Sequence, residues 1–310
     1  MPSSPCVDLH SHSTASDGTL TPTELVNAAQ RVGLAGLALT DHDTGNGLLE
    51  AQAEAARIGM RFVPGIEITA EFRPPLGMDI LGHFINPLSP ALQQMSDLLI
   101  EARDSRNPKI IARLNELGCD VTLEQAQAIA RKNIPAGQPF VLGRPHIAQA
   151  LVDSGCVASV KQAFDVYLGS GGSAYFDKAR LTPRQAIACI HNAGGLATLA
   201  HPVHLAIVNP TELQTLVGSL VDMGLDGIEV WHADHRPQDS ALFKDIARHY
   251  NLAVTGGSDF HGRNKPDVAL GLGKGNVAVP VEVLNHLEER WHQRAGTTAA
   301  PVSPQPREAL

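Results

Sequence analysis

The sequence predicts an α/β protein whose main body is an irregular (β/α)7 barrel with a helical insertion domain. Two observations lead to this fold. Short apolar runs alternate with amphipathic helical segments over most of the 310 residues, which is the pattern of a parallel sheet built from βα units. One long stretch in the middle of the chain breaks the alternation, because it contains helical patterns only.

Seven apolar runs are the expected strands. They lie at Val7–His10, Gly36–Thr40, Phe62–Ile68, Asp79–Ile85, Leu196–His201, Gly227–Trp231 and Ala253–Gly256. The helices of the barrel are expected at Pro22–Val32, Gly47–Ile58, Pro183–Asn192, Thr211–Met223, Asp239–His249 and Val281–Trp291. Two of them begin with a threonine followed by a proline, at Thr21 and Thr182, which is a favoured way to start a helix.

The insertion interrupts the barrel and splits it into residues 1–87 and 179–294. Within residues 88–178, helical patterns lie at Leu92–Leu117, Leu123–Arg131, Arg144–Ser154 and Ser159–Leu168. The run Gly169–Ser173 lacks the strand, the helix and the lysine of a phosphate-binding loop, so a flexible return to the barrel is the simpler interpretation. Residues 295–310 have no periodicity and predict a disordered tail.

The composition limits the classes of partner. The formal net charge of −8 argues against duplex DNA and anionic membranes, because both attract basic surfaces. No long apolar run and no signal-peptide pattern occur, which predicts a cytoplasmic protein without a membrane partner. Four cysteines, Cys6, Cys119, Cys156 and Cys189, are far apart in the sequence, and we expect reduced structural thiols.

Histidines and carboxylates gather where the predicted strands end. His10 and His12 occupy alternate residues at the end of the first strand, so their side chains point the same way. Because the carboxyl ends of parallel barrel strands meet in one mouth, residues far apart in the sequence converge there. The candidate metal ligands are His10, His12, Asp17, His42, Glu67, His83, His201, Asp259 and His261.

This mixture of imidazoles and carboxylates suits Mn, Zn or Fe, and it does not suit the all-oxygen sites of Ca or Mg. One ion takes roughly three or four protein ligands, so this many candidates imply two or three divalent ions. Taken singly, each residue has a structural alternative. His83 could be a core histidine bonded to a carbonyl, and Glu67 could be a surface charge at a strand end. Their joint occurrence at successive strand ends favours the metal site.

Four motifs carry a resemblance to a known family. They are DLHSHS at Asp8–Ser13, TDHD at Thr40–Asp43, AHP at Ala200–Pro202 and SDFH at Ser258–His261, and the glutamate of PGIE, Glu67, also matches. With these motifs the barrel resembles the polymerase and histidinol phosphatase (PHP) domain, which belongs to the amidohydrolase-like metal hydrolases. The resemblance implies a TIM-like PHP barrel with the insertion over its mouth.

The resemblance also implies how the ligands are shared. One ion would take His10, His12, Glu67 and Asp259, a second would share Glu67 and add His83 and His201, and a third would take Asp17, His42 and His261. Many members carry histidine at the position of Asp17. A carboxylate is a harder ligand than imidazole, so it favours Mn or weakens the third site.

Two ions that share a carboxylate lower the pKa of a bound water and clamp both oxygens of an in-line displacement, which suits phosphate ester hydrolysis. The chain has no G-x-S-x-G motif, so metal-activated hydroxide is the expected nucleophile. His232 and His204 are candidate proton donors to the leaving group, and Asp17 or His42 would serve if the third ion is absent.

Substrate-binding residues are expected in the insertion. Arg103, Arg106 and Asn107 follow one helical face, and Arg144 opens another helix, so together they predict a site for a second phosphate. His204, near the mouth, is a further candidate contact to the substrate. The alternative is that the arginines are solvated or ion-paired.

The barrel, the insertion and the R-x-x-R-N stretch resemble the PHP subgroup that hydrolyses the 3′-phosphate of nucleoside 3′,5′-bisphosphates such as pAp to give nucleoside 5′-monophosphates. Relatives in that subgroup act as 5′-to-3′ exonucleases on short RNA. The expected protein is therefore a nucleotide-binding phosphatase, with a small anionic nucleotide or short single-stranded RNA as its partner. A histidinol-phosphate phosphatase, a non-catalytic metal-binding PHP module and a metal-dependent deacylase are the alternatives.

Overall fold

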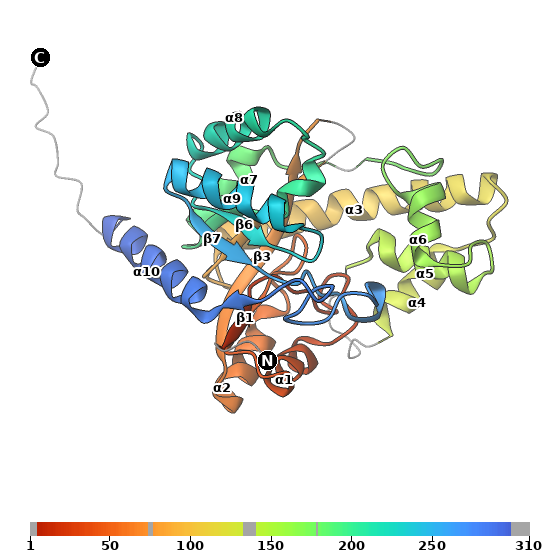
Figure 1. Cartoon of the computed structure of the whole chain (residues 1–310). Coiled ribbons are helices and arrows are strands. Elements are labelled where there is room, and N and C mark those ends of the chain that lie inside the picture. Colours follow the sequence, from red (N-terminus) through yellow and green to blue (C-terminus); the bar gives the residue numbers. More distant parts are fainter. Residues whose placement is uncertain (1–4, 74–76, 133–140, 178, 299–310) are drawn as a thin grey trace, which may run out of the picture.

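One curved sheet forms the body of the protein. The structure is a computed structural model of the chain, and it describes residues 5–73, 77–132, 141–177 and 179–298 (Figure 1). The strands occur in the spatial order β7-β6-β5-β4-β3-β2-β1-β8. Their bounds are β1 Cys6–Asp8, β2 Gly36–Leu39, β3 Arg61–Glu71, β4 Gly77–His83, β5 Leu196–Leu199, β6 Gly227–Trp231, β7 Ala253–Gly256 and β8 Val279–Pro280.

The sheet curls until β1 meets β7, so the predicted irregular α/β barrel is confirmed. The backbone N–H of Leu9 donates to the carbonyl of Gly256 at 3.1 Å, and a parallel bridge joins Ser11 to Phe260 just beyond the strands. The two-residue strand β8, which the sequence did not predict, pairs antiparallel with β1. The carboxyl ends of β1, β2, β3, β5, β6 and β7 therefore share one mouth.

Strand β4 corrects the expectation of an all-parallel sheet. It pairs antiparallel with β3, where Glu71 lies opposite Gly77, and antiparallel with β5. Only a few residues connect β3 to β4, whereas a parallel connection needs about a dozen, so a hairpin is the only arrangement available. As a result the beginning of β4, and not its end, lies at the mouth.

Within the described part of the chain, six helices outside the insertion cover the barrel. They are α1 Pro22–Arg31, α2 Leu48–Ile58, α7 Pro183–Asn192, α8 Pro210–Val221, α9 Pro237–Tyr250 and α10 Val281–Thr298. The predicted caps are present, because the Thr21 and Thr182 side chains accept from backbone N–H groups three residues later. Helix α10 continues to Thr298, so the expected tail does not begin at residue 295, and residues 299–310 lie outside the described residues.

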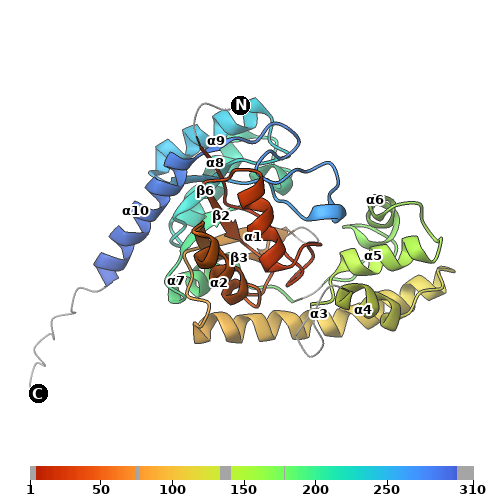
Figure 2. The same ribbon diagram turned by 90° about the horizontal axis from the view of Figure 1, so that it is seen from below.

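The insertion has its own core. Its helices are α3 Pro90–Glu116, α4 Leu123–Arg131, α5 Arg144–Asp153 and α6 Val160–Ala163, followed by the π-helical turn η1 Phe164–Leu168. Figure 2 shows α3 running from the barrel to α4 and α5. Leu92 and Leu99 of α3 belong to the barrel core, whereas Ile110 and Leu114 belong to the separate core of the insertion. We call residues 103–177 the cap.

Cys119 and Cys156 form a disulfide, which corrects the expectation that all four cysteines are reduced thiols. Cys119 follows α3 and Cys156 follows α5, and packing of these helices in the cap core brings their Cα atoms to 5.7 Å. Cys6 and Cys189 are free. Among the described residues, no helix combines the length and the apolar character that a membrane crossing requires.

Candidate metal centre and substrate cavity

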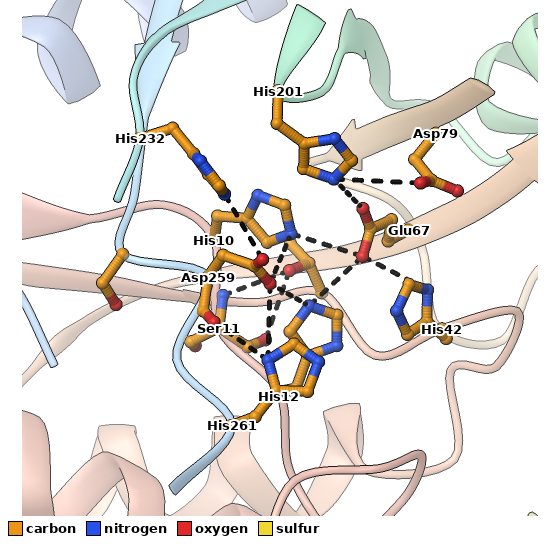
Figure 3. A network of polar contacts seen from close by, with 12 residues as sticks. His10, Ser11, His12, His42, Glu67, Asp79, His201, His232, Asp259 and His261 are labelled. Atoms are coloured by element: carbon orange, nitrogen blue, oxygen red, sulfur yellow. Dashed lines mark hydrogen bonds and ion pairs between the residues drawn. The ribbon is translucent and has the colours of Figure 1, made fainter. Parts of the chain in front are cut away.

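A buried cluster of imidazoles and carboxylates fills the mouth of the barrel (Figure 3). Its members lie in β3 or in the segments that follow β1, β2, β5, β6 and β7, so six separate parts of the chain contribute to it. They are His10, His12, His42, Glu67, His201, His232, Asp259 and His261. The convergence expected from the strand-end pattern is therefore present for these residues.

Four members surround one point. The candidate ligand atoms of His10, His12, Glu67 and Asp259 all lie within 4.8 Å of one another. Glu67 Oε2 is 3.3 Å from His10 Nε2 and 3.2 Å from His12 Nε2. Asp259 Oδ1 is 3.6 Å and 3.3 Å from the same two nitrogens. This is the set that the resemblance assigns to the first ion.

The residues of this group fit a divalent cation. His10 Nε2, both ring nitrogens of His12 and Glu67 Oε2 are buried and make no hydrogen bond with any residue in the described part of the chain. An unsatisfied buried polar atom costs about 1–3 kcal/mol, so several together call for a common partner. Nitrogen and oxygen donors converging on one point are the ligands of Mn, Zn or Fe.

A buried glutamate that the sequence analysis missed orients His10. Glu229, inside β6, accepts from His10 Nδ1 at 3.0 Å with one oxygen and from the backbone N–H of His201 at 2.7 Å with the other. The first bond turns His10 Nε2 toward the group, as second carboxylates do around metal-binding histidines. A glutamate in an otherwise apolar strand was the only sequence signal.

A second group shares Glu67 and contains His42 and Asp79. Glu67 Oε2 lies 3.2 Å from His42 Nδ1, and Glu67 Oε1 lies 2.9 Å from His201 Nε2. Asp79 Oδ2 is 3.8 Å from His201 Nε2, and Asp79 Oδ1 is buried without a hydrogen bond among the described residues. Asp79, which the sequence analysis did not consider, therefore stands beside the expected second site.

His83 lies outside these groups, contrary to the expectation that it is a ligand. Its Nε2 is 2.9 Å from the carbonyl oxygen of Leu9, and burial lowers its pKa to about 4, so the neutral ring donates to that carbonyl. The reversed direction of β4 explains its position. Asp79 pairs with Thr69 near the mouth, whereas His83 pairs with Gly65, deeper in the barrel. His83 is therefore better described as a core histidine that is bonded to a backbone carbonyl than as a metal ligand.

A third group consists of His12, Asp17, His42 and His261. Asp17 Oδ1 is 3.3 Å from His261 Nε2 and 3.8 Å from His12 Nδ1, and the rings of His12 and His261 are stacked with their centroids 4.0 Å apart. The structure thus brings together Asp17, His42 and His261, as expected for the third site, and adds His12.

The second oxygen of Asp259 is held away from the group. Lys265 Nζ donates to Asp259 Oδ2 at 2.5 Å, and His232 Nε2 lies 3.3 Å from the same oxygen. His232 is buried, is not among the residues that line the cavity described below, and has its pKa lowered by burial. This position favours a role in holding Asp259 over proton donation to a leaving group. Lys265 closely follows the SDFH motif in the sequence, but it was not predicted as a residue of the site.

A cavity of about 1000 Å³ leads from the third group to the cap. Asp17, His42 and His261 line its barrel side, and His204 lines its edge with Nε2 2.9 Å from Asp234. The loop after β7, which contains the 3-10 turn η3 Gly262–Asn264, extends toward the cap in Figures 1 and 2. Its residues 263–267 line the cavity as well.

Three of the predicted phosphate ligands line this cavity. Arg103, at the barrel side, forms an ion pair with Asp43, and Arg144 donates to the carbonyl of Leu168 at 2.9 Å. Arg106 is 6% exposed, and its Nε makes no hydrogen bond to a described residue. Asn107, which was expected to join them, is buried outside the cavity lining.

Asn107 makes structural hydrogen bonds and does not line the substrate cavity. Its Nδ2 donates to the carbonyl of Leu142 at 2.8 Å, and its Oδ1 accepts from Arg106 at 3.0 Å. The first bond joins α3 to the segment before α5, and the second orients the guanidinium. We therefore expect Asn107 to position Arg106 rather than to contact substrate.

Metal binding should release protons. Burial disfavours the charged form of His12, but the nearby carboxylates of Asp259 and Glu67 outweigh it and raise its pKa to about 9. Burial also disfavours the charged form of His201, and its bond to Glu67 raises the pKa to about 9. Both rings are therefore protonated at pH 7 in the metal-free protein, whereas a metal ligand must be neutral.

We expect the apparent affinity for Mn²⁺ to increase as the pH rises from about 6.5 to 9, because fewer protons then compete with the ion. Titration calorimetry at pH 7 in two buffers of different ionisation enthalpy measures the protons released. An apparent binding enthalpy that is the same in both buffers would contradict the expectation.

Comparison with known proteins identifies relatives of the whole fold. The PHP domain family matches residues 8–258. A 3′,5′-nucleoside bisphosphate phosphatase of Chromobacterium violaceum is 35% identical over 255 residues, which are 82% of this chain and 87% of that protein. The 5′-3′ exoribonuclease Rnm of Escherichia coli is 33% identical over 293 residues, which are 94% of this chain and 95% of that protein.

A solved structure from Bifidobacterium adolescentis, described as that of a metal-dependent phosphoesterase, superposes with a TM-score of 0.81 at 30% identity. The superposition covers 94% of this chain and 98% of that one, so it includes both barrel and cap. The family match spans the segments that bring His10, Glu67 and His201 together. The chain belongs to the PHP domain family.

Proposed function

We propose that this protein is a phosphoric monoester hydrolase that removes the 3′-phosphate from nucleoside 3′,5′-bisphosphates with the help of two or three divalent ions, Mn²⁺ foremost. One observation carries the proposal. Residues of two candidate metal groups (Asp17, His42, Asp79 and His261) and three arginines (Arg103, Arg106 and Arg144) line the same cavity. The activity named for the Chromobacterium violaceum relative agrees with this arrangement.

The residues of the mouth would hold the ions in three overlapping sets. His10, His12, Glu67 and Asp259 would hold the first, Glu67 would be shared with a second, and Asp17 with its neighbours would hold a third. Bound there, the ions would lower the pKa of a water and neutralise charge on the scissile phosphate. Glu229, Lys265 and His232 would keep the ligands oriented through the bonds described above.

The arginines would take the 5′-phosphate. Burial, together with the like charges of Arg144 and Arg103, lowers the pKa of Arg106 to about 9. An anion among the three guanidinium groups would relieve their repulsion and supply a partner for Arg106 Nε. A substrate anchored there presents its 3′-phosphate toward the mouth.

Cleavage of short 5′-phosphorylated RNA is a second candidate function. It needs the same two subsites, because the bond cut lies on the 3′ side of a 5′-phosphorylated nucleotide. The exoribonuclease Rnm, which matches most of this chain, supports it. A histidinol-phosphate phosphatase is disfavoured, because cationic side chains outnumber acidic ones among the residues that line the cavity.

A phosphate-release assay with Mn²⁺ tests the proposal. The substrates are adenosine 3′,5′-bisphosphate, 3′-AMP, 5′-AMP, histidinol phosphate and a 5′-phosphorylated oligoribonucleotide, with EDTA as the control. Charge-assisted hydrogen bonds contribute about 1.5–3 kcal/mol, so kcat/KM for the bisphosphate should exceed that for 3′-AMP by roughly 10- to 100-fold. Equally slow release from every compound would contradict the proposal.

A further inference from the structure

The cap contributes several aromatic and aliphatic side chains to the lining of the cavity, and we call this set the aromatic wall. These are Pro145, Val160, Phe164, Tyr175 and Phe176. The metal groups and the arginines do not account for these residues, since a phosphate alone gains nothing from apolar walls. A substrate with a large flat apolar group, however, would bury it here.

Tyr175 is held as a fixed plane. Its hydroxyl accepts from Arg180 Nη2 at 3.3 Å and donates to Asp177 Oδ1 at 3.3 Å. The guanidinium carbon of Arg144 lies 5.5 Å from the centre of its ring. A ring fixed at its edge and on one face loses little conformational entropy when another ring stacks on it.

Arg144 connects the Tyr175 ring to the arginines of the expected 5′-phosphate subsite. It packs against Tyr175, and its charge acts on Arg106, which bears the unsatisfied Nε. Tyr175 of the aromatic wall and the expected 5′-phosphate subsite are therefore adjacent. In a nucleotide, a base and a 5′-phosphate on one ribose have the same close relation.

The glycine-rich run, which the sequence indicates as a return to the barrel, also contributes to the cavity lining. Gly169 and Ser170 line the cavity directly after η1. A Cβ on Gly169 would lie 2.6 Å from the carbonyl oxygen of Phe164, and one on Gly172 would lie 2.5 Å from that of Tyr167. Glycine is thus needed for the run to pack onto the π-helical turn, a kind of turn that is frequent at functional sites.

We propose that Phe164, Tyr175 and Phe176, together with Pro145 and Val160, form a subsite that binds the nucleobase of the substrate by stacking. This inference rests on the proposed function. Stacking accepts every base, because each has a flat face. The subsite therefore distinguishes nucleotides from sugar phosphates rather than one base from another.

The test compares adenosine 3′,5′-bisphosphate with 1-deoxyribose 3,5-bisphosphate, in which hydrogen replaces the base. With the unaltered Mn²⁺-loaded protein, we expect KM to be roughly 5- to 100-fold higher for the compound without a base, and kcat to stay within a few-fold. Equal KM values for the two compounds would overturn the subsite and leave the proposed function intact. Phosphate release from neither would overturn the proposed function, and this inference with it.

Substitutions in the subsite show which residues cause the difference in KM between the two compounds. Tyr175→Ala should reduce the KM ratio between the two compounds, whereas Tyr175→Phe, which keeps the ring and loses only the hydroxyl, should retain most of it. Phe164→Leu keeps an apolar side chain without a stacking face and should also reduce the ratio. A ratio unchanged by both Tyr175→Ala and Phe164→Leu would overturn the assignment to these residues. Circular dichroism melts establish that each variant is folded.

Discussion

Replacing Glu67 with glutamine should lower kcat for adenosine 3′,5′-bisphosphate by about 1000-fold or more. The change keeps the shape of the side chain but removes the charge that faces His10, His12 and His201. Because Glu67 belongs to two of the candidate metal groups, its loss affects both. Lewis-acid stabilisation contributes several kcal/mol to such reactions, which corresponds to a loss of this size.

The metal content of the purified protein is the second readout for Glu67→Gln. We expect the variant to contain at least one metal ion fewer per chain than the unaltered protein. Inductively coupled plasma mass spectrometry measures this content. Glu71→Gln is the matched control, since Glu71 ends the same strand and is exposed. A Glu67→Gln protein with normal metal content and normal kcat would show that the cluster is not a metal site.

Arg106→Ala should raise KM for the bisphosphate by roughly 10- to 100-fold and leave KM for 3′-AMP nearly unchanged. The reason is that Arg106 is buried in the cavity wall with an unsatisfied Nε, so a phosphate there gains charge-assisted hydrogen bonds. Arg144→Ala should act in the same direction. Arg106→Lys keeps the positive charge but loses the planar guanidinium group that can donate two hydrogen bonds to one phosphate. Its KM for the bisphosphate should lie between those of the unaltered protein and Arg106→Ala.

Steady-state kinetics on both substrates separate this effect from damage to the metal centre. Arg113→Ala is the control, because Arg113 lies on the same helix and pairs on the surface with Glu116. An equal rise in KM for 3′-AMP would mean that Arg106 supports the cap and does not bind the second phosphate. An unchanged KM for both compounds would remove Arg106 from the site.

Local sequence patterns predicted the elements well. Helices α4 and α7 and strands β6 and β7 have the bounds that were expected, and most others differ by only a few residues. Apolar periodicity and helix-start residues act over one or two turns, so the sequence displays them directly. The same is true of His10 and His12, whose alternate spacing on one strand determines that they share a face.

Such local patterns could not predict the direction in which β4 runs. An apolar run has no direction, and the antiparallel pairing with β3 and β5 depends on residues far apart in the sequence. That direction decided whether Asp79 or His83 would reach the mouth. The Cys119–Cys156 disulfide is a similar case, because packing of the cap helices brought the two residues together.

The sequence by itself determined the α/β alternation, the helical insertion and most members of the cluster in the mouth, since each depends on short-range spacing or on a strand end. Only the tertiary structure decided that Glu229 orients His10, that Lys265 and His232 hold Asp259, and that Asn107 leaves Arg106 to face the cavity. These contacts join residues from different elements. Their geometry follows from how strands and helices pack, and no local pattern encodes it.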